Sequence, residues 1–179
     1  SALLTAAIID LDGTMVDTLG DFAEALNRML HDLALPAIAA PVIEQMVGKG
    51  SEHLLRSVLN NVLAKEGKAP AAIEIEALYA RAWPSYQHHY LAINGDYAHV
   101  YPGVVAGLQA LRHAGLRLAC LTNKPTAFAL PLLRAKGLDG YFEQVFGGDS
   151  FERKKPDPLP LLKTCEVLQT EPARTLMVG

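Results

Sequence analysis

The sequence predicts an α/β fold, a Rossmann-like core built on a parallel sheet with an all-helical domain inserted into it. Three observations favour this class. A short apolar run at residues 5–9 ends at Asp10 just before a turn, as a buried parallel strand does. The block from 17 to 98 carries only helical periodicity. After residues 101–103, strand-like and helical patterns alternate to the end of the chain.

Apolar residues within the helical block repeat at helical spacing in three stretches. We expect a helix through residues 22–33 with Thr18 as its N-cap, one through residues 54–63 with Ser51 as its N-cap, and one across about residues 73–90, interrupted near Pro84.

The second half of the chain predicts the remaining strands and helices. These are a helix at 104–111 ended by Gly115, a strand at 116–121, a helix at 128–133 ended by Gly137, a short strand at 144–146, a helix at 157–168 and a strand at 175–178. Such alternation predicts right-handed crossovers between parallel strands. We expect residues 1–16 and 99–179 to form the core. Residues 17–98 would form a cap over the carboxyl ends of the strands, where α/β sheets bind ligands.

Composition and charge exclude several function classes. The 179 residues carry a formal net charge of −3 with a pI near 6.0, which gives no basic footprint for nucleic acid. No apolar stretch approaches a membrane span, and no signal-peptide pattern is visible. Cys120 and Cys165 lack CxxC spacing and fit structural thiols in a reducing compartment. We predict a cytoplasmic protein without nucleic-acid or membrane partners; the oligomeric state stays open, with a homodimer as one option.

Two aspartates follow the first predicted strand. Asp10 and Asp12 are separated by one residue, so the turn lets both carboxylates approach one substrate. Such a pair repels a phosphate, and a bound Mg²⁺ would neutralise the pair and polarise the phosphoryl oxygens. One carboxylate can then act as nucleophile and the other as general acid–base. Taken alone, the pair is also compatible with an ordinary turn, in which Asp and Gly are common.

Polar residues also follow a later predicted strand and a later loop. Thr122 and Asn123 offer a hydroxyl and a backbone or side-chain N–H that can bind phosphate oxygens, with a helix N-cap or loop as the alternative. Lys155, followed by a proline, can hold its charge against a nucleophile and a phosphoryl group, with a solvated loop lysine as the alternative. Each alternative is favoured in isolation, but the three sites in this order are far more specific together.

The combination resembles the haloacid dehalogenase superfamily. Residues 8–18, which read Ile-Ile-Asp-Leu-Asp-Gly-Thr-Met-Val-Asp-Thr, look like its motif I. Leu121-Thr122-Asn123-Lys124 is similar to motif II, and Lys155-Pro156-Asp157-Pro158 to motif III. The resemblance covers essentially the whole chain, and the phosphoglycolate phosphatase branch matches best.

The resemblance implies a role for each matching residue. Asp10 would attack phosphorus and form an aspartyl-phosphate, and Asp12 would protonate the leaving alkoxide and then activate water. Thr122 and Asn123 would bind the phosphoryl group, and Lys155 would stabilise its charge. The Asp10 carboxylate and the Asp12 carbonyl would hold Mg²⁺. An acid–base aspartate at position 12 also favours phosphoryl chemistry, because the dehalogenase branch lacks it.

One part of the family pattern is not present in the sequence. Family members continue the last strand into a motif IV of the type Gly-Asp-Ser with a further Asp, which completes the metal site. Here residues 176–179 stop just before those acids. We therefore expect a truncated chain, whose metal site is completed by residues that follow Gly179.

A glycine-flanked lysine opens one helix of the predicted cap. The Gly48-Lys49-Gly50 segment is no P-loop, because the required Ser or Thr and a leading strand are missing. Backbone N–H groups at the helix start, together with Lys49, could bind an anion such as the carboxylate of 2-phosphoglycolate. A flexible turn is an equal alternative, and Arg56 is a weaker candidate for the same contact.

These features predict the magnesium-dependent hydrolysis of a small phosphorylated metabolite, with 2-phosphoglycolate as the preferred substrate. Two alternatives stay open. A phosphosugar mutase of the same superfamily would return the phosphoryl group to a bound sugar phosphate. A non-catalytic binding module could share the fold, although the intact set of Asp10, Asp12, Thr122 and Lys155 argues against it.

Overall fold

The computed structural model describes residues 3–179. The chain divides into two compact units. One comprises the residues up to Asp17 together with His99–Gly179, and the other comprises Thr18–Ala98. The boundary expected between residues 16 and 17 thus lies one residue later in this division.

The first unit is built on a parallel sheet of four strands. They are β1 (Ala6–Ile9), β4 (Arg117–Leu121), β5 (Gln144–Phe146) and β6 (Thr175–Val178), and they lie side by side in the order β5-β4-β1-β6. Every neighbouring pair is parallel. The β1 strand is therefore central, which explains why its four residues are all buried and apolar.

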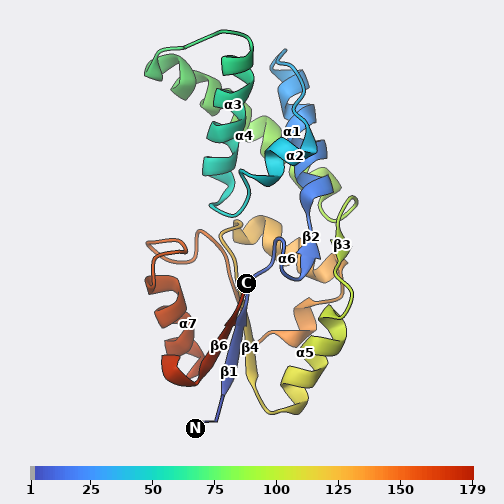
Figure 1. Cartoon of the computed structure of the whole chain (residues 1–179), viewed down its shortest axis with the longest axis vertical. Helices are drawn as coiled ribbons and strands as arrows, with labels where there is room; N and C mark the ends of the chain where they lie inside the picture. Colours follow the sequence, from blue (N-terminus) through green and yellow to red (C-terminus); the bar gives the residue numbers. More distant parts are fainter. Residues whose placement is uncertain (1–2) are drawn as a thin grey trace. The chain divides into compact units, whose positions relative to one another are not determined.

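Helices cover both sides of this sheet. They are α5 (Val104–His113), α6 (Thr126–Ala135) and α7 (Leu159–Leu168), with short 3₁₀ turns η1 (Asp139–Tyr141) and η2 (Pro172–Arg174). Figure 1 shows α7 on one side of the sheet and α5 on the other. Ala6 and Ile8 of β1 pack with Ala119 and Leu121 of β4 against Cys165 of α7. The predicted α/β class is thereby confirmed, and Cys120 and Cys165 are both free, buried thiols.

A short antiparallel ribbon stands at the point where the chain leaves and re-enters this unit. It pairs β2 (Val16–Asp17) with β3 (His99–Val100). The ribbon was not predicted, because two residues per strand are too few to show a period in the sequence. It brings the two ends of the inserted block together.

The second unit contains only helices among its elements. They are α1 (Leu19–Asp32), α2 (Ala40–Glu44), α3 (Ser51–Lys65) and α4 (Ala72–Ile93). The core between α1 and α4 is aromatic: Phe22 lies 5.7 Å from Tyr90, and Tyr90 lies 5.5 Å from Tyr86, measured between ring centroids. Asp21, near the start of α1, connects the beginning of this unit to its end. Its buried carboxylate accepts hydrogen bonds from the backbone N–H groups of Gly95 and Tyr97, which follow α4.

Three predicted helix details are wrong. The α4 helix runs through Pro84 without interruption, because the buried Ala82 and Tyr86 on either side of the proline hold both halves in one packed helix. The last helix starts at Leu159 rather than Asp157, since the Asp157 side chain accepts the Leu159 N–H from outside the helix. Gly50, not Ser51, occupies the N-cap of α3. The short helix α2 was not predicted at all.

Among the described residues, no helix is both long enough and apolar enough to cross a membrane. The predicted location and oligomeric state stay predictions.

Candidate active site

The site residues follow strands that end at the same edge of the sheet. Parallel pairing places Ile9 beside Cys120, so Asp10 and Thr122 each begin a loop just beyond the paired ends of β1 and β4. The ladder continues one step into both loops: the Asp10 N–H donates to Val178 and the Thr122 N–H donates to Phe146. This arrangement brings together the carboxylate pair and the Thr-Asn pair of the first unit, at the edge where such sheets bind ligands.

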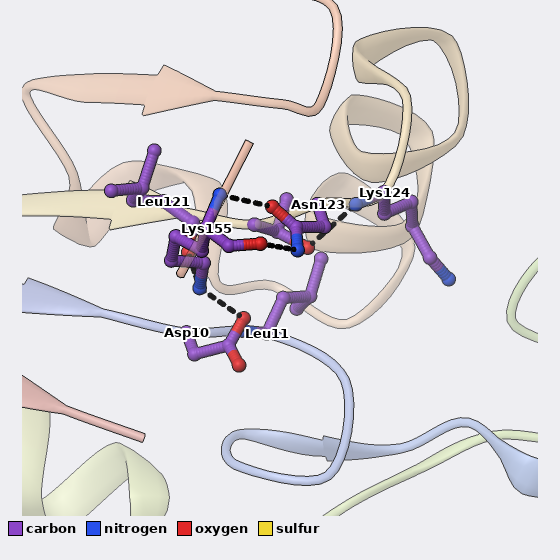
Figure 2. Close-up of polar contacts among 7 residues, drawn as sticks. Asp10, Leu11, Leu121, Asn123, Lys124 and Lys155 are labelled. Atoms are coloured by element: carbon purple, nitrogen blue, oxygen red, sulfur yellow. Dashed lines mark hydrogen bonds and ion pairs between the residues drawn. The ribbon is translucent and has the colours of Figure 1, made fainter. Parts of the chain in front are cut away.

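A lysine from a distant loop meets the carboxylate of Asp10 (Figure 2). Lys155 Nζ lies 3.0 Å from Asp10 Oδ1 and 2.7 Å from the carbonyl oxygen of Leu121, to which it donates. The Leu11 N–H also donates to Oδ1, over 2.7 Å. Among residues 3–179, no hydrogen bond or ion pair reaches the other oxygen, Oδ2. One oxygen of Asp10 is therefore fixed, and the second is open to a ligand.

The turn after β1 fixes the spacing of the two aspartates. The N–H groups of Thr14, Met15 and Val16 all converge on the Leu11 carbonyl, at 3.0–3.2 Å. The turn requires a positive φ of 74° at residue 13, which glycine adopts without strain. Leu11 is fully buried and anchors the turn between Asp10 and Asp12.

Asp12 has a lysine of its own, and sequence reasoning did not single it out. Lys124 Nζ lies 2.8 Å from Asp12 Oδ1, and the side chains of the two residues are 2% and 10% exposed. In the sequence, Lys124 stands out only as the last residue of the Leu-Thr-Asn-Lys segment. Its position two residues after Thr122, at the edge that carries Asp12, was the only signal for this pairing in the sequence.

Thr122 and Asn123 are buried in the loop after β4. The Thr122 hydroxyl oxygen accepts the Lys124 N–H over 3.1 Å, so its own hydrogen can still be donated to a ligand. The side-chain amide of Asn123 instead bonds to the backbone of Lys155. Its expected contact with a phosphoryl group would thus have to come from the backbone N–H.

Asp149 supports the same loop from the segment after β5. Its carboxylate accepts hydrogen bonds from the N–H of Thr126, over 3.0 Å, and from the Thr126 hydroxyl, over 2.9 Å. Partial burial alone would raise the pKa of Asp149, but these two hydrogen bonds outweigh burial and hold the pKa below its ordinary value. Asp149 therefore caps the start of α6.

The two predicted anion-binding residues, Lys49 and Arg56, lie in the second unit. Lys49 is exposed in the turn before α3, between Gly48 with φ 114° and Gly50 with φ 92°. Arg56, on α3, is not available in the same way, because Glu76 binds its guanidinium through two oxygens and Glu52 binds its Nε. The structure leaves Lys49 as the better of the two candidates for an anion.

Asp10 and Asp12 offer oxygen donors suited to Mg²⁺. Within the described residues, no group of three or more His, Cys, Asp or Glu side chains gathers as a metal site. The Asp10 carboxylate and the backbone carbonyl of Asp12 are nevertheless oxygen donors of the kind that suits a small hard cation that keeps several of its waters, as Mg²⁺ does in proteins.

Comparison with known proteins identifies the family. The model of the haloacid dehalogenase-like hydrolases matches residues 4–179. The chain belongs to the haloacid dehalogenase-like hydrolase family. The predicted family and the predicted hydrolase class are thereby confirmed.

Curated relatives and solved structures agree with this assignment. The chain is 45% identical over 175 residues to the plasmid-encoded phosphoglycolate phosphatase of Cupriavidus necator, covering 98% of this chain and 72% of that protein. It is 44% identical over 176 residues to the phosphoglycolate phosphatase of Nitrosospira multiformis, covering 98% and 74%. A crystal structure described as a predicted phosphoglycolate phosphatase from Haemophilus somnus 129PT superposes with a TM-score of 0.90 at 28% identity, covering 97% of this chain and 76% of that one.

Proposed function

We propose that this protein hydrolyses a small phosphomonoester, 2-phosphoglycolate, through an aspartyl-phosphate on Asp10. The observation that carries the proposal is the state of the Asp10 carboxylate at the end of β1. Lys155 and the Leu11 N–H hold Oδ1, while Oδ2 is open. The substrate is supported by relatives of 44–45% identity that are named phosphoglycolate phosphatases.

The reaction proceeds in two displacement steps. In the first, an Asp10 carboxylate oxygen forms a bond to phosphorus, the ester P–O bond breaks, and its electron pair leaves on the alcohol oxygen, which takes a proton from Asp12. In the second, a water oxygen forms a bond to phosphorus as the Asp10–phosphorus bond breaks, and Asp12 takes the proton from the water.

Several groups would stabilise the phosphoryl oxygens. Two donors of Lys155 are used by Asp10 and Leu121, and a lysine ammonium has a third donor for a substrate oxygen. The Thr122 hydroxyl and the Asn123 N–H would add neutral donors. Mg²⁺, held by the Asp10 carboxylate and the Asp12 carbonyl, would supply charge neutralisation at the same oxygens.

The second unit would serve as the cap that recognises the rest of the substrate. Lys49, exposed at the start of α3, would contact the carboxylate of 2-phosphoglycolate. The amide groups at a helix start add to the attraction for an anion.

A phosphate-release assay tests the proposal. We expect the full protein with Mg²⁺ to release phosphate from 2-phosphoglycolate, and EDTA to abolish the release. Asp10→Asn should remove turnover while circular dichroism shows an intact fold. Turnover near the wild-type rate in Asp10→Asn would remove Asp10 as nucleophile. Isomerised product from a sugar phosphate supplied with a sugar bisphosphate would indicate a mutase instead.

A further inference from the structure

A deeply buried ion pair joins Lys124 to Asp12. Lys124 Nζ lies 2.8 Å from Asp12 Oδ1, and only 2% of the lysine side chain is exposed. A buried ammonium loses its hydration, which is unfavourable by several kcal/mol unless a partner charge lies close to it. In the other ion pair of the site, between Lys155 and Asp10, the side chains are 15% and 29% exposed.

The backbone of Lys124 is held on both sides. Its N–H donates to the Thr122 hydroxyl oxygen over 3.1 Å, and its carbonyl accepts the Gly148 N–H over 2.9 Å. The carbonyl also lies so close to Gly147 that a Cβ added there would stand 2.6 Å from it. With the backbone fixed and the side chain enclosed, the ammonium has a defined position.

The ion pair links two separate loops of the first unit. Asp12 lies in the turn after β1, whereas Lys124 lies in the loop after β4, so the ion pair connects the two loops that carry the proposed chemistry. A general acid or base must lie within hydrogen-bond distance of the proton that it transfers, about 2.6–3.2 Å between heavy atoms. A lysine that holds one oxygen of Asp12 constrains where the other oxygen can reach.

We propose that Lys124 is a positioning residue for Asp12, holding Oδ1 so that Oδ2 delivers the proton to the leaving alcohol. This inference rests on the proposed function. Lys124 touches neither the substrate nor the phosphoryl group in this role, and it acts only through Asp12.

The leaving group of the substrate separates this role from a structural one. An alkoxide needs a proton as the P–O bond breaks, while 4-nitrophenolate leaves readily without one. The kcat/KM value reports the steps up to the first irreversible one, the transfer to Asp10, so the later hydrolysis step does not enter the comparison. Loss of a well-placed acid should therefore lower kcat/KM for 2-phosphoglycolate and spare 4-nitrophenyl phosphate.

The test measures both esters with the full protein, Lys124→Met and Lys124→Arg. For Lys124→Met we expect kcat/KM on 2-phosphoglycolate to fall about 10- to 100-fold, since general acid catalysis contributes about 10²–10⁴-fold and Asp12 itself remains. The loss on 4-nitrophenyl phosphate should be within about 3-fold, and Lys124→Arg should recover part of the lost rate. In an Asp12→Asn background, Lys124→Met should add no further loss. Lys163→Met, at an exposed ion pair on α7, is the matched control and should behave as wild type.

The positioning role would be overturned if Lys124→Met lowered kcat/KM equally for the two esters. It would also be overturned if Lys124→Met lowered kcat/KM as much in the Asp12→Asn background as in the wild type. If Lys124→Met does not fold by circular dichroism, Lys124→Arg decides alone, because a displaced cation should still lower the rate on the alkyl ester more than on the aryl ester. A wild-type protein that cleaves neither ester would instead contradict the proposed function. The two failures are thus distinguishable.

Discussion

The side-chain amide of Asn123 holds the backbone of Lys155 at both of its polar groups. Asn123 Nδ2 donates to the Lys155 carbonyl over 2.9 Å, and Asn123 Oδ1 accepts the Lys155 N–H over 3.0 Å (Figure 2). Fixing the peptide groups on both sides of the Lys155 Cα directs the lysine side chain to Asp10. Of the two N–H sources expected to bind phosphate at Asn123, backbone and side chain, the side chain is instead used to place the charge of Lys155.

Removing this amide should lower activity through Lys155. Two hydrogen bonds at about 0.5–1.5 kcal/mol each give an expected loss of about 1–3 kcal/mol in transition-state stabilisation for Asn123→Ala, measured as kcat/KM. Asn123→Asp keeps the oxygen acceptor and loses the N–H donor. Its kcat/KM should therefore lie between the values for the wild type and Asn123→Ala. In a Lys155→Ala background, Asn123→Ala should cause almost no additional loss. A full additional loss there would mean that Asn123 acts on the substrate directly.

Much of the fold could be predicted because its elements are long or strongly patterned. The buried run before Asp10 indicated a strand, and the apolar stripes of the helical block indicated helices. The β5 strand has the predicted bounds of residues 144–146. The β2–β3 ribbon and α2 were not predicted, since two to five residues carry no usable period. The interruption predicted near Pro84 is absent, because packing in α4 overrides the local cost of a helical proline.

The candidate site was predictable in its composition and in the approach of Lys155 to the nucleophile, but not in the pairing of Lys124 with Asp12. Strand ends place Asp10 and Thr122 at one edge by topology alone. The partner of each lysine depends on how the loops fold against one another, because the paired residues are far apart in sequence. Lys155 lies 145 residues after Asp10, and Lys124 lies 112 residues after Asp12. A motif lists the groups of a site, and side-chain packing decides their partners.

Lys49 provides a test of substrate specificity. An exposed charge contact contributes little, but one desolvated around the substrate could contribute about 1.5–3 kcal/mol. Lys49→Ala should then lower kcat/KM for 2-phosphoglycolate much more than for a phosphomonoester without a carboxylate. Lys65→Ala, at the exposed far end of α3, is the control. Equal losses on both substrates, or none, would leave Lys49 a solvated turn lysine.

Asp149 should make stability depend on acid pH. Its pKa is lower in the folded protein than in the unfolded chain, where an aspartate titrates near 3.9. The ionised form is thus favoured by folding, and its contribution is present above the unfolded pKa and lost as pH falls through the folded pKa. Asp149→Ala should lower the free energy of unfolding by about 1 kcal/mol at pH 7, as for a lost helix cap.

Asp149→Asn isolates the charge, because asparagine keeps an oxygen acceptor for Thr126. Urea unfolding at a series of pH values should show Asp149→Asn less stable than wild type at pH 7, with the difference shrinking below pH 4. A difference that stays constant over this range would show that the charge of Asp149 does not contribute.

Gly148 should accept no side chain, because the loop after β4 lies directly against it. A Cβ at Gly148 would overlap the carbonyl oxygen of Asn123 and stand 3.0 Å from the carbonyl carbon of the same residue. Backbone atoms cannot rotate away as a flexible side chain does. Because Asn123 also holds Lys155, the clash should displace the lysine that meets Asp10. We expect Gly148→Ala to lower the free energy of unfolding by about 1–3 kcal/mol, as overpacking does, and to lower phosphate release as well.

Gly107, inside α5, is the matched control for the same substitution. A Cβ there would meet no atom within 4 Å, so only the helix propensity changes. Gly107→Ala should therefore raise the free energy of unfolding by about 0.5–1 kcal/mol and leave activity unchanged. Urea unfolding and phosphate release of the two variants, side by side, separate a steric effect at the site from the general effect of replacing glycine. If Gly148→Ala were as stable and active as wild type, the glycine at 148 would not be needed for close packing, and Asn123 could not depend on it for its position.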